Sequence, residues 1–425
     1  MKRVNVVGAG LAGCETSYQL LKRQIPVRLW EMRPLKKTAV HQSANFAELV
    51  CSNSLRSDEI HNAVGLLKAE LRSLDSLIMH FADEHALPSG SALAVDREGF
   101  SSAVTTYLKN QPLVEVVNEE YEVINDEPTI IASGPLTSAR LSQEIAKLLK
   151  AEQLYFYDAV APIVTLESID LNTAYYKSRY DKGSADYLNC PLTKEEFSIF
   201  YNELIKAECH ESHHFAEFFP GCLPVEELAR KGEKTLLYGP MKPVGLEKDG
   251  KRPYAVVQLR RDNYAASLYN LVGFQTQLTW PEQLRILRLI PGLKNCEIVR
   301  YGVIHRNTFI NSPLVLDHNY HCKDELFFAG QMTGVEGYVE STASGLIAGL
   351  NMALALDGQA MLELNNLTMI GALANYIAKA DSRNFQPMNA NYGIMGLANH
   401  VRKNERKAEY YRQSQSELAK IKGKL

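Results

Sequence analysis

Short apolar runs and longer amphipathic segments alternate toward the two ends of this chain. Residues 4–7 and 27–31 each form a run of strand length, and the residues between them have the spacing of a helix. Residues 129–135 form a third run that ends in a turn. Residues 326–330 form a fourth, followed by a helical stretch over 339–356. Strands that alternate with helices predict an α/β fold built on a parallel sheet.

The interior of the first half supplies further elements. Apolar residues step by three and four from Asn62 to Asp83, which predicts one helix with a single stripe facing the core. Apolar runs at 114–117 and 120–124 predict two more strands. The intervening segment from Met32 to Ser57 is polar and irregular, and a loop of that length is usually functional.

A glycine turn follows the first strand and carries the clearest chemical signal. Residues 8–13 read Gly-Ala-Gly-Leu-Ala-Gly, and Glu31 ends the next strand. This order is typical of a dinucleotide site, in which Gly8 permits the turn, Gly10 permits a pyrophosphate to approach, and Gly13 lets the helix pack on the sheet. Glu31 is placed to accept hydrogen bonds from a ribose, which favours FAD or NAD over NADP. The alternative is a glycine turn without a ligand.

A second glycine-rich turn lies about 300 residues later. Residues 330–338 follow an apolar strand and precede a helix rich in small residues. A second turn of this kind favours FAD, a long cofactor held at both ends, over a one-ended NAD site. An ordinary tight contact between helix and strand is the alternative. Since no second GxGxxG motif is present, we expect a nicotinamide reductant to visit the flavin transiently.

The middle of the chain differs in character from its two ends. From about residue 157 to residue 300, aromatic residues, prolines and short β-like runs dominate. Because 425 residues exceed the usual size of one core, we expect two domains. Residues 1–156 and 301–425 are predicted to form a discontinuous FAD-binding, Rossmann-like domain of the glutathione-reductase type. Residues 157–300 are predicted to form an inserted, mixed α+β domain for the substrate.

Composition narrows the class of protein. Hydrophobic content is 46%, no run of about 18 apolar residues suggests a membrane span, and the first strand leaves no room for a signal peptide. Seven cysteines without a CxxC pair favour reduced thiols in a cytoplasmic protein and indicate no metal site. Net charge is −3, but residues 402–424 hold eight basic and three acidic side chains. That basic tail is either a solvated helix or an RNA contact.

Several stretches of the chain together match a known family, and some of them lie in the middle region. The chain resembles, from end to end, the folate- and FAD-dependent tRNA uracil-5-methyltransferases, the smaller relatives of the glucose-inhibited-division flavoproteins. The matching stretches are residues 8–15, 31–34, 46–56, 92–97, 176–183, 187–191, 239–247, 270–276, 305–313, 328–340 and 384–393.

The resemblance implies a reductive methylation of RNA. 5,10-Methylenetetrahydrofolate would supply the carbon, FAD the electrons, and NADH or NADPH would regenerate the flavin. The product would be 5-methyluridine, at position 54 in the T-loop of tRNA. The cofactor-binding residues expected are Gly8, Ala9, Gly10, Leu11, Ala12, Gly13, Glu31, Met32, Arg33, Gly330, Gln331, Gly337 and Tyr338.

Two cysteines on loops are candidates for the chemistry. Uracil becomes reactive at C5 when a thiolate attacks C6, so a cysteine is expected near the flavin. Cys51 lies in the long loop, and Cys222 precedes a short helix predicted from Pro224 to Lys231, whose positive end would favour a thiolate. The resemblance implies that Cys222 attacks uracil and that Cys51 has a supporting role at the flavin.

Other functions remain open at this point. The same chemistry on ribosomal RNA is one, a plain FAD-dependent NAD(P)H oxidoreductase is a second, and a non-catalytic FAD-holding RNA-binding protein is a third. The sequence does not reveal an oligomeric state. If the basic tail is only a solvated helix, RNA would lie over a second group of basic residues: Lys242, Lys248, Lys251, Arg252, Arg260 and Arg261.

Overall fold

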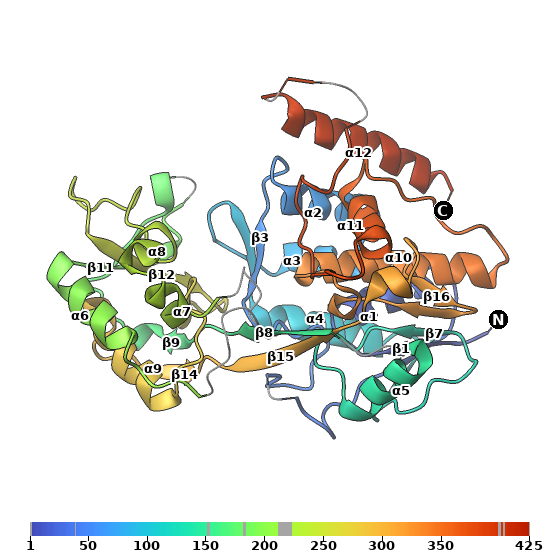
Figure 1. Cartoon of the computed structure of the whole chain (residues 1–425), viewed down its shortest axis with the longest axis horizontal. Coiled ribbons are helices and arrows are strands. Elements are labelled where there is room, and N and C mark those ends of the chain that lie inside the picture. The colour runs from blue at the N-terminus through green and yellow to red at the C-terminus, as the bar shows by residue number, and fades with distance from the viewer. Residues whose placement is uncertain are drawn as a thin grey trace.

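A six-stranded sheet forms the centre of the first structural part (Figure 1). Its order is β16-β17-β7-β1-β2-β6, and all neighbouring pairs are parallel except β16 with β17. The strands are β1 (Val4–Val7), β2 (Val27–Trp30), β6 (Val114–Val117), β7 (Thr129–Ile131), β16 (His321–Lys323) and β17 (Leu326–Phe328). The predicted α/β fold with a parallel sheet is therefore confirmed.

The structure is a computed structural model that describes residues 2–38, 40–150, 154–181, 184–210, 223–397, 401–402 and 404–424. Side chains are described for these residues except 156–158 and 304–306.

Helices and a small antiparallel sheet surround the central sheet. The sheet is β3-β5-β4, with strands β3 (Ser54–Ser57), β4 (Ala86–Leu87) and β5 (Ala92–Val95). The helices are α1 (Leu11–Leu21), α2 (Ala63–Ser73), α3 (Leu77–Glu84), α4 (Arg97–Lys109), α5 (Ala139–Leu149), α10 (Tyr338–Leu356), α11 (Met369–Lys379) and α12 (Arg406–Lys422). Together these elements enclose one large hydrophobic core.

A second part with its own core lies beside the first (Figure 1). Its sheet has the order β10-β11-β12-β13-β9-β14 and is antiparallel throughout. The strands are β9 (Ile163–Thr165), β10 (Tyr175–Tyr176), β11 (Tyr187–Leu192), β12 (Ala255–Arg261), β13 (Leu268–Leu271) and β14 (Ile298–Arg300). The helices are α6 (Lys194–Leu204), α7 (Val225–Arg230), α8 (Glu233–Tyr238) and α9 (Trp280–Leu287).

One antiparallel ladder runs between the two parts (Figure 1). It pairs β8 (Leu154–Ala159) with β15 (Ile304–Phe309), so the chain leaves the first part and returns to it along neighbouring strands. The predicted boundary after residue 156 falls inside β8, and the boundary after residue 300 falls just before β15. The domain limits 1–156, 157–300 and 301–425 stay a prediction, because two strands shared between the parts give no sharp border.

Two local predictions are wrong. The single helix expected from Asn62 to Asp83 is two helices, because Asp75 has a left-handed backbone (φ 59°) and Ser76 caps α3 by accepting a hydrogen bond from Met79 N. The strand expected at 120–124 is not formed in this described segment. Tyr121 instead turns back to pack edge-on against the ring of Trp30, with ring centres 5.1 Å apart.

Helix α10 passes through the core. Among the described residues it is the one helix long and apolar enough to cross a membrane, but 89% of its most apolar window is buried inside the molecule. Its Gly345 lies against α1, where an added Cβ would approach the carbonyl oxygen of Ala12 to 2.3 Å. Core packing accounts for its composition.

The last helix, α12, is anchored by a buried carboxylate rather than fully solvated. Glu70 on α2 has no exposed surface, and it accepts hydrogen bonds from the Met369 and Ile370 N–H groups and from Ser414 Oγ of α12. Burial raises the pKa of Glu70 to about 7, against the opposing effect of these three donors. The contact between α12 and the core therefore includes a group that titrates near neutral pH.

We expect this carboxyl to make the protein less stable as the pH rises. Its pKa is raised on folding from 4.5 to about 7, so the folded state holds a proton that the unfolded state releases. The contribution is complete below about pH 4.5 and is lost as the pH rises through about 7, which amounts to about 3 kcal/mol. Urea unfolding at pH 5 and pH 8 should show this difference in the wild type and lose it in Glu70→Gln. The control Glu417→Gln changes a carboxyl whose pKa is lowered, so its pH 5 to pH 8 difference should match that of the wild type.

Candidate active site

A cavity opens at the carboxyl ends of the parallel strands, the edge where open α/β sheets bind ligands. Its walls are the residues that follow β1, β2, β7 and β17, and its empty volume is about 1060 Å³, including space open to solvent. Of the predicted cofactor-binding residues, all but Ala9 and Gly13 line this cavity or the adjoining one described below. Those two are buried behind the turn.

The three glycines of the first turn have different environments. Gly8 has φ +100°, and a Cβ there would lie 2.6 Å from the carbonyl oxygen of Ala132. A Cβ on Gly13 would lie 1.8 Å from the carbonyl oxygen of Gly8, so the helix can only pack this closely with glycine. At Gly10 a Cβ would meet no atom within 4 Å and would project into open space. This is the arrangement expected if Gly10 faces a ligand.

Glu31 lies at the cavity wall, but its carboxylate is already bonded within the chain. Oε1 accepts from the Arg33 N–H and Nε, at 3.1 and 2.9 Å, and Oε2 accepts from Ala9 N and Arg33 Nη2, at 3.1 and 3.0 Å. Burial would raise the pKa of Glu31, but Arg33 and the backbone donors hold it below its ordinary value. Four donors fill the four acceptor positions of a carboxylate. A ribose hydroxyl would have to share or replace one of them.

The second glycine turn lies across the same cavity. Gly330 and Gly337 have φ values of +81° and +118°, and Gly337 caps the N-terminus of the 19-residue helix α10. The N-termini of α1 and α10 therefore both border the cavities, and each favours a negatively charged or electron-rich group. The arrangement suits a long ligand that is contacted at two separate places, such as FAD: the first turn would hold the pyrophosphate in its middle, and the second would lie beside its ring system.

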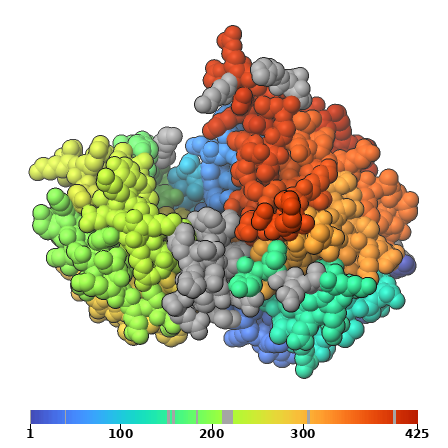
Figure 2. All heavy atoms as spheres, viewed as in Figure 1, coloured from blue at the N-terminus to red at the C-terminus, as the bar shows by residue number. Residues whose placement is uncertain are grey.

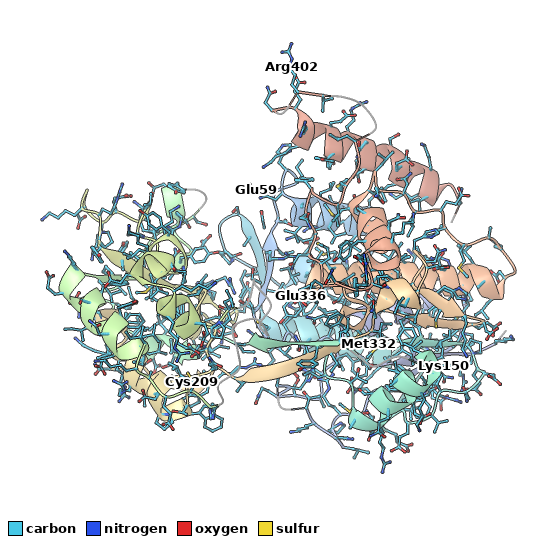
Figure 3. The ribbon with its side chains drawn as sticks, viewed as in Figure 1. Glu59, Lys150, Cys209, Met332, Glu336 and Arg402 are labelled. Carbon is cyan, nitrogen blue, oxygen red and sulfur yellow. The ribbon has the colours of Figure 1, made fainter. Side chains whose placement is uncertain are left out.

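A second cavity continues from the first, with an empty volume of about 1570 Å³. The side chains of both parts of the structure line it, among them Cys51 and Arg260. Glu336, labelled near the centre of Figure 3, is also in its wall. Residues that line both cavities are Val50, Pro135, Leu136, Gln331 and Tyr338. The two cavities are therefore joined beside the Cys51 loop.

The Cys51 loop is held by its backbone. The hydroxyl oxygen of Tyr338 accepts hydrogen bonds from the Cys51 and Ser52 N–H groups, at 2.7 and 3.3 Å. Arg300 Nη2 donates to the carbonyl oxygen of Val50 at 2.6 Å, and Arg97 donates to that of Leu49. The backbone groups of residues 49–52, on both sides of the thiol, are thus held by side chains from different parts of the fold.

A third arginine fixes the far side of this loop. Arg260, which is 7% exposed, donates from Nη2 to Ser52 Oγ at 2.6 Å and from Nε to Asn53 Oδ1 at 3.1 Å. Because Arg260 is buried, it does not belong to the predicted group of basic residues that would contact RNA. These arginine contacts were missed from the sequence, because nothing local in the chain links Arg260 or Arg300 to residue 51.

The three arginines that hold the Cys51 loop differ in their ion pairs. Arg97 is paired with the buried carboxylate of Asp262 at 2.8 Å, whereas neither Arg260 nor Arg300 forms a salt bridge with any carboxylate that the structure describes. Burial lowers the pKa of both unpaired guanidiniums, but arginine stays charged at neutral pH. The carboxylate of Asp262 also acts on Arg260 and Arg300, so the arginines and Asp262 form one charged group around the Cys51 loop.

Cys222 lies outside the described residues. The helix expected after it is present as α7, although Pro224 is its N-cap and Lys231 follows its last residue. Val225 N donates to the carbonyl oxygen of Gln275, a residue in the wall of the second cavity, at 2.7 Å. Glu226 and Glu227 occupy the first turn of α7, where burial raises the pKa of Glu226 to about 7 and Glu227 pairs with Arg230.

Replacing Tyr338 with Phe should loosen the Cys51 loop, because two N–H donors lose their acceptor. We expect iodoacetamide to alkylate Cys51 roughly tenfold faster, equivalent to about 1.4 kcal/mol of easier opening, as measured by peptide mass spectrometry. Tyr376→Phe is the control, because that hydroxyl donates to the carbonyl oxygen of Gln386, away from the loop. Equal alkylation rates in both variants would contradict the assigned role of Tyr338.

Comparison with known proteins agrees with this geometry. The profile of the family described as glucose inhibited division protein A matches residues 3–360. The chain has a fold similar to that of GidA from Aquifex aeolicus, with a TM-score of 0.70 at 15% identity, covering 99% of this chain and 75% of that one.

Three curated relatives have much higher identity, and all three are named methylenetetrahydrofolate–tRNA-(uracil-5-)-methyltransferase TrmFO. The protein from Exiguobacterium sibiricum is 56% identical over 429 residues, covering 99% of both chains. Those from Bacillus cytotoxicus and Bacillus licheniformis are 56% and 58% identical, covering 96% and 92% of both chains respectively. The chain therefore belongs to the glucose inhibited division protein A family and, within it, to the group of the TrmFO methyltransferases.

Proposed function

We propose that this chain transfers a one-carbon unit from 5,10-methylenetetrahydrofolate to C5 of a uridine in tRNA, with FAD as cofactor and NADH or NADPH as electron source. The observation that carries the proposal is the junction of the two cavities: a dinucleotide-type site opens beside a loop that presents Cys51. A plain NAD(P)H oxidoreductase needs the first feature and has no use for a thiol held in this way.

The chemistry assigns different tasks to the two cysteines. A thiolate that adds to C6 of uracil makes C5 nucleophilic, and we assign this step to Cys222. Cys51, in the wall of the second cavity, has a supporting role beside the cofactor. FAD, when bound, supplies the electrons that reduce the transferred carbon to a methyl group. The arginines around the Cys51 loop hold residues 50, 52 and 53 and thereby keep the thiol oriented.

The target uridine is that of the tRNA T-loop, and ribosomal RNA is the alternative substrate for the same chemistry. A reaction that needs tRNA, reduced folate and a reduced nicotinamide belongs to the cytoplasm. No separate nicotinamide site is required, because either reductant can approach the flavin from the second cavity.

The direct test is incubation of the FAD-loaded protein with undermodified tRNA, methylenetetrahydrofolate and NADPH, followed by nucleoside analysis. We expect 5-methyluridine in the T-loop and none when S-adenosylmethionine replaces the folate. Cys222→Ala should lower the rate by at least about a thousandfold, as removal of a nucleophile does, while FAD stays bound. Cys51→Ala should also lower methyl transfer, with NADPH still able to reduce the flavin.

Cys322→Ala is the matched control, because that half-buried thiol on β16 lies outside both cavities. Flavin reduction without methylation in the wild type would favour the plain oxidoreductase. Methylation of ribosomal RNA but not tRNA would move the substrate and keep the chemistry. Full activity in Cys222→Ala would remove that residue from the reaction.

The basic end of α12 is the surface we assign to tRNA. Arg402, labelled at the top of Figure 3, and the neighbouring Arg406 and Lys407 are exposed and form no ion pair with any described carboxylate. The carboxylate of Glu409 in the same turn pairs with Arg412, so the side chains of Arg406 and Lys407 are available to a phosphate. Figure 2 shows this end of α12 beside a hollow between the two parts of the molecule.

The other end of α12 provides a control of equal charge. Lys420 pairs with Glu417, and Lys422 is the last residue of α12. We expect Arg406→Glu with Lys407→Glu to weaken tRNA binding about tenfold or more and to lower the salt slope by about one per lost phosphate contact. Lys420→Glu with Lys422→Glu makes the same change in net charge and should have a smaller effect, with FAD content unchanged in both.

Filter binding at several salt concentrations measures both quantities. Equal weakening in the two variants would mean that only net charge matters. No change in either would place the RNA elsewhere, for example over Lys242, Lys248 and Lys251. Charge reversal is preferred to truncation of the tail, because removing α12 also removes Ser414 from the buried Glu70.

A further inference from the structure

Two buried asparagines in the wall of the second cavity have unused hydrogen-bonding atoms. Asn270 on β13 is 3% exposed and Asn307 on β15 is 1% exposed. Within the described part of the chain, neither Asn270 Nδ2 nor Asn307 Oδ1 has a hydrogen-bond partner. Buried polar groups are almost always paired, since leaving one unpaired is costly. Both residues line the cavity that also contains Cys51.

The contrast with the other buried asparagines is what makes this pair informative. Five of them donate an Nδ2–H group to a neighbour in the fold: Asn5, Asn53, Asn189, Asn351 and Asn375. Outside the two cavities, Gln277 Oε1 and Asn311 Oδ1 are also buried without a partner, but the amide nitrogens of these side chains donate to Glu227 Oε1 and to the carbonyl oxygen of Ser382. Asn270 and Asn307 differ in that neither side chain forms a hydrogen bond within the described part of the chain and both line one cavity, which indicates that their partner is a ligand.

We propose that Asn270 and Asn307 bind the –CO–NH– edge of the ring that reacts beside the cofactor. A free amide donor and a free amide acceptor are complementary to a cyclic amide, in which a C=O accepts and the adjacent N–H donates. Besides the flavin ring itself, two molecules of the proposed reaction carry such an edge, namely the target uracil and the pterin of the folate, and the FAD content of the variants separates these two from the flavin. This inference rests on the proposed function and names the residues that select the reacting ring.

The two residues come from different strands, so the distance between their side-chain amides depends on how the two parts are arranged. Asn270 belongs to the antiparallel sheet of the second part, where its backbone pairs with Arg260 and Ile163. Asn307 belongs to the ladder between the parts. A ring that binds both amides therefore contacts the second part through Asn270 and the β8–β15 ladder through Asn307. A ring without the amide edge would leave both atoms unpaired, a strong basis for rejection.

Leucine has nearly the shape of asparagine, so Asn270→Leu and Asn307→Leu remove the amides with little change in packing. We expect each variant to keep full FAD content and to unfold at the wild-type temperature or above it, because no bond within the fold is lost. We expect kcat/KM to fall roughly 10- to 100-fold for one co-substrate. A fall for tRNA assigns the pair to uracil, and a fall for methylenetetrahydrofolate assigns it to the pterin.

Asn351→Leu is the matched control. That buried amide donates to Asn319 Oδ1 and accepts from Leu362 N, so its loss should lower the unfolding temperature and leave kcat/KM unchanged. Asparagines that only support the fold would give this same pattern at 270 and 307, which would overturn the inference. Unchanged kinetics, or loss of FAD from both variants, would also overturn it. The wild-type enzyme is assayed first: no methylation there would overturn the proposed function itself, whereas an active wild type with unaffected variants overturns the inference alone.

Discussion

The close approach of α1 and α10 is the constraint on which the rest of the structure depends. Thr16 Oγ1 donates to the carbonyl oxygen of Gly345 at 2.8 Å, and a Cβ on Gly349 would lie 3.0 Å from the carbonyl oxygen of Thr16. The two helices can approach this closely only because small residues face each other. Since each helix begins at a cavity wall, the same contact sets the distance between the two glycine turns, and thereby the length of ligand that can be held at both ends.

A second layer of organisation comes from arginines that reach across the molecule. Arg260 and Arg300 belong to strands of the antiparallel sheet, yet their guanidiniums bind the loop around Cys51, which belongs to the parallel part. The position of this thiol therefore reflects the arrangement of both cores. A shift of one part against the other would move the loop, change its charge environment and widen the cavity at once.

Structural elements can be predicted from the sequence where their determinants lie close together in the chain. The first glycine turn could be predicted because Gly8 has a left-handed backbone (φ +100°) and because a Cβ on Gly13 would meet the carbonyl oxygen of Gly8, and both causes lie within the motif. The break between α2 and α3 could not, because Ser76 is fixed by donating to Glu15 of α1, 61 residues away along the chain. Residue roles that depend on contacts between distant segments of the chain could not be predicted from the sequence either.

The same limit applies to the candidate site. Most of the predicted cofactor-binding residues do line the two cavities, since a motif and a resemblance both mark them. Arg300 could not, because its contact with Val50 spans 250 residues, and an orphaned amide such as that of Asn307 is visible only after every neighbour has been placed. The charge environment of Glu31 could not be predicted either. The sequence suggests that its carboxylate is available to a ribose, but the Arg33 guanidinium donates hydrogen bonds to both of its oxygens.

The interrupted course of the chain has a consequence for its biosynthesis. The central sheet takes β1, β2, β6 and β7 from the first third of the chain and β17 from the last quarter. Thr16 forms its hydrogen bond with Gly345, which lies 329 residues further along the chain. On the ribosome, the antiparallel part is complete before the parallel sheet can close, and contacts of such long range form slowly. Cofactor capture is then a late event in maturation, and during the interval a nascent chain exposes the unpaired face of α1 to chaperones.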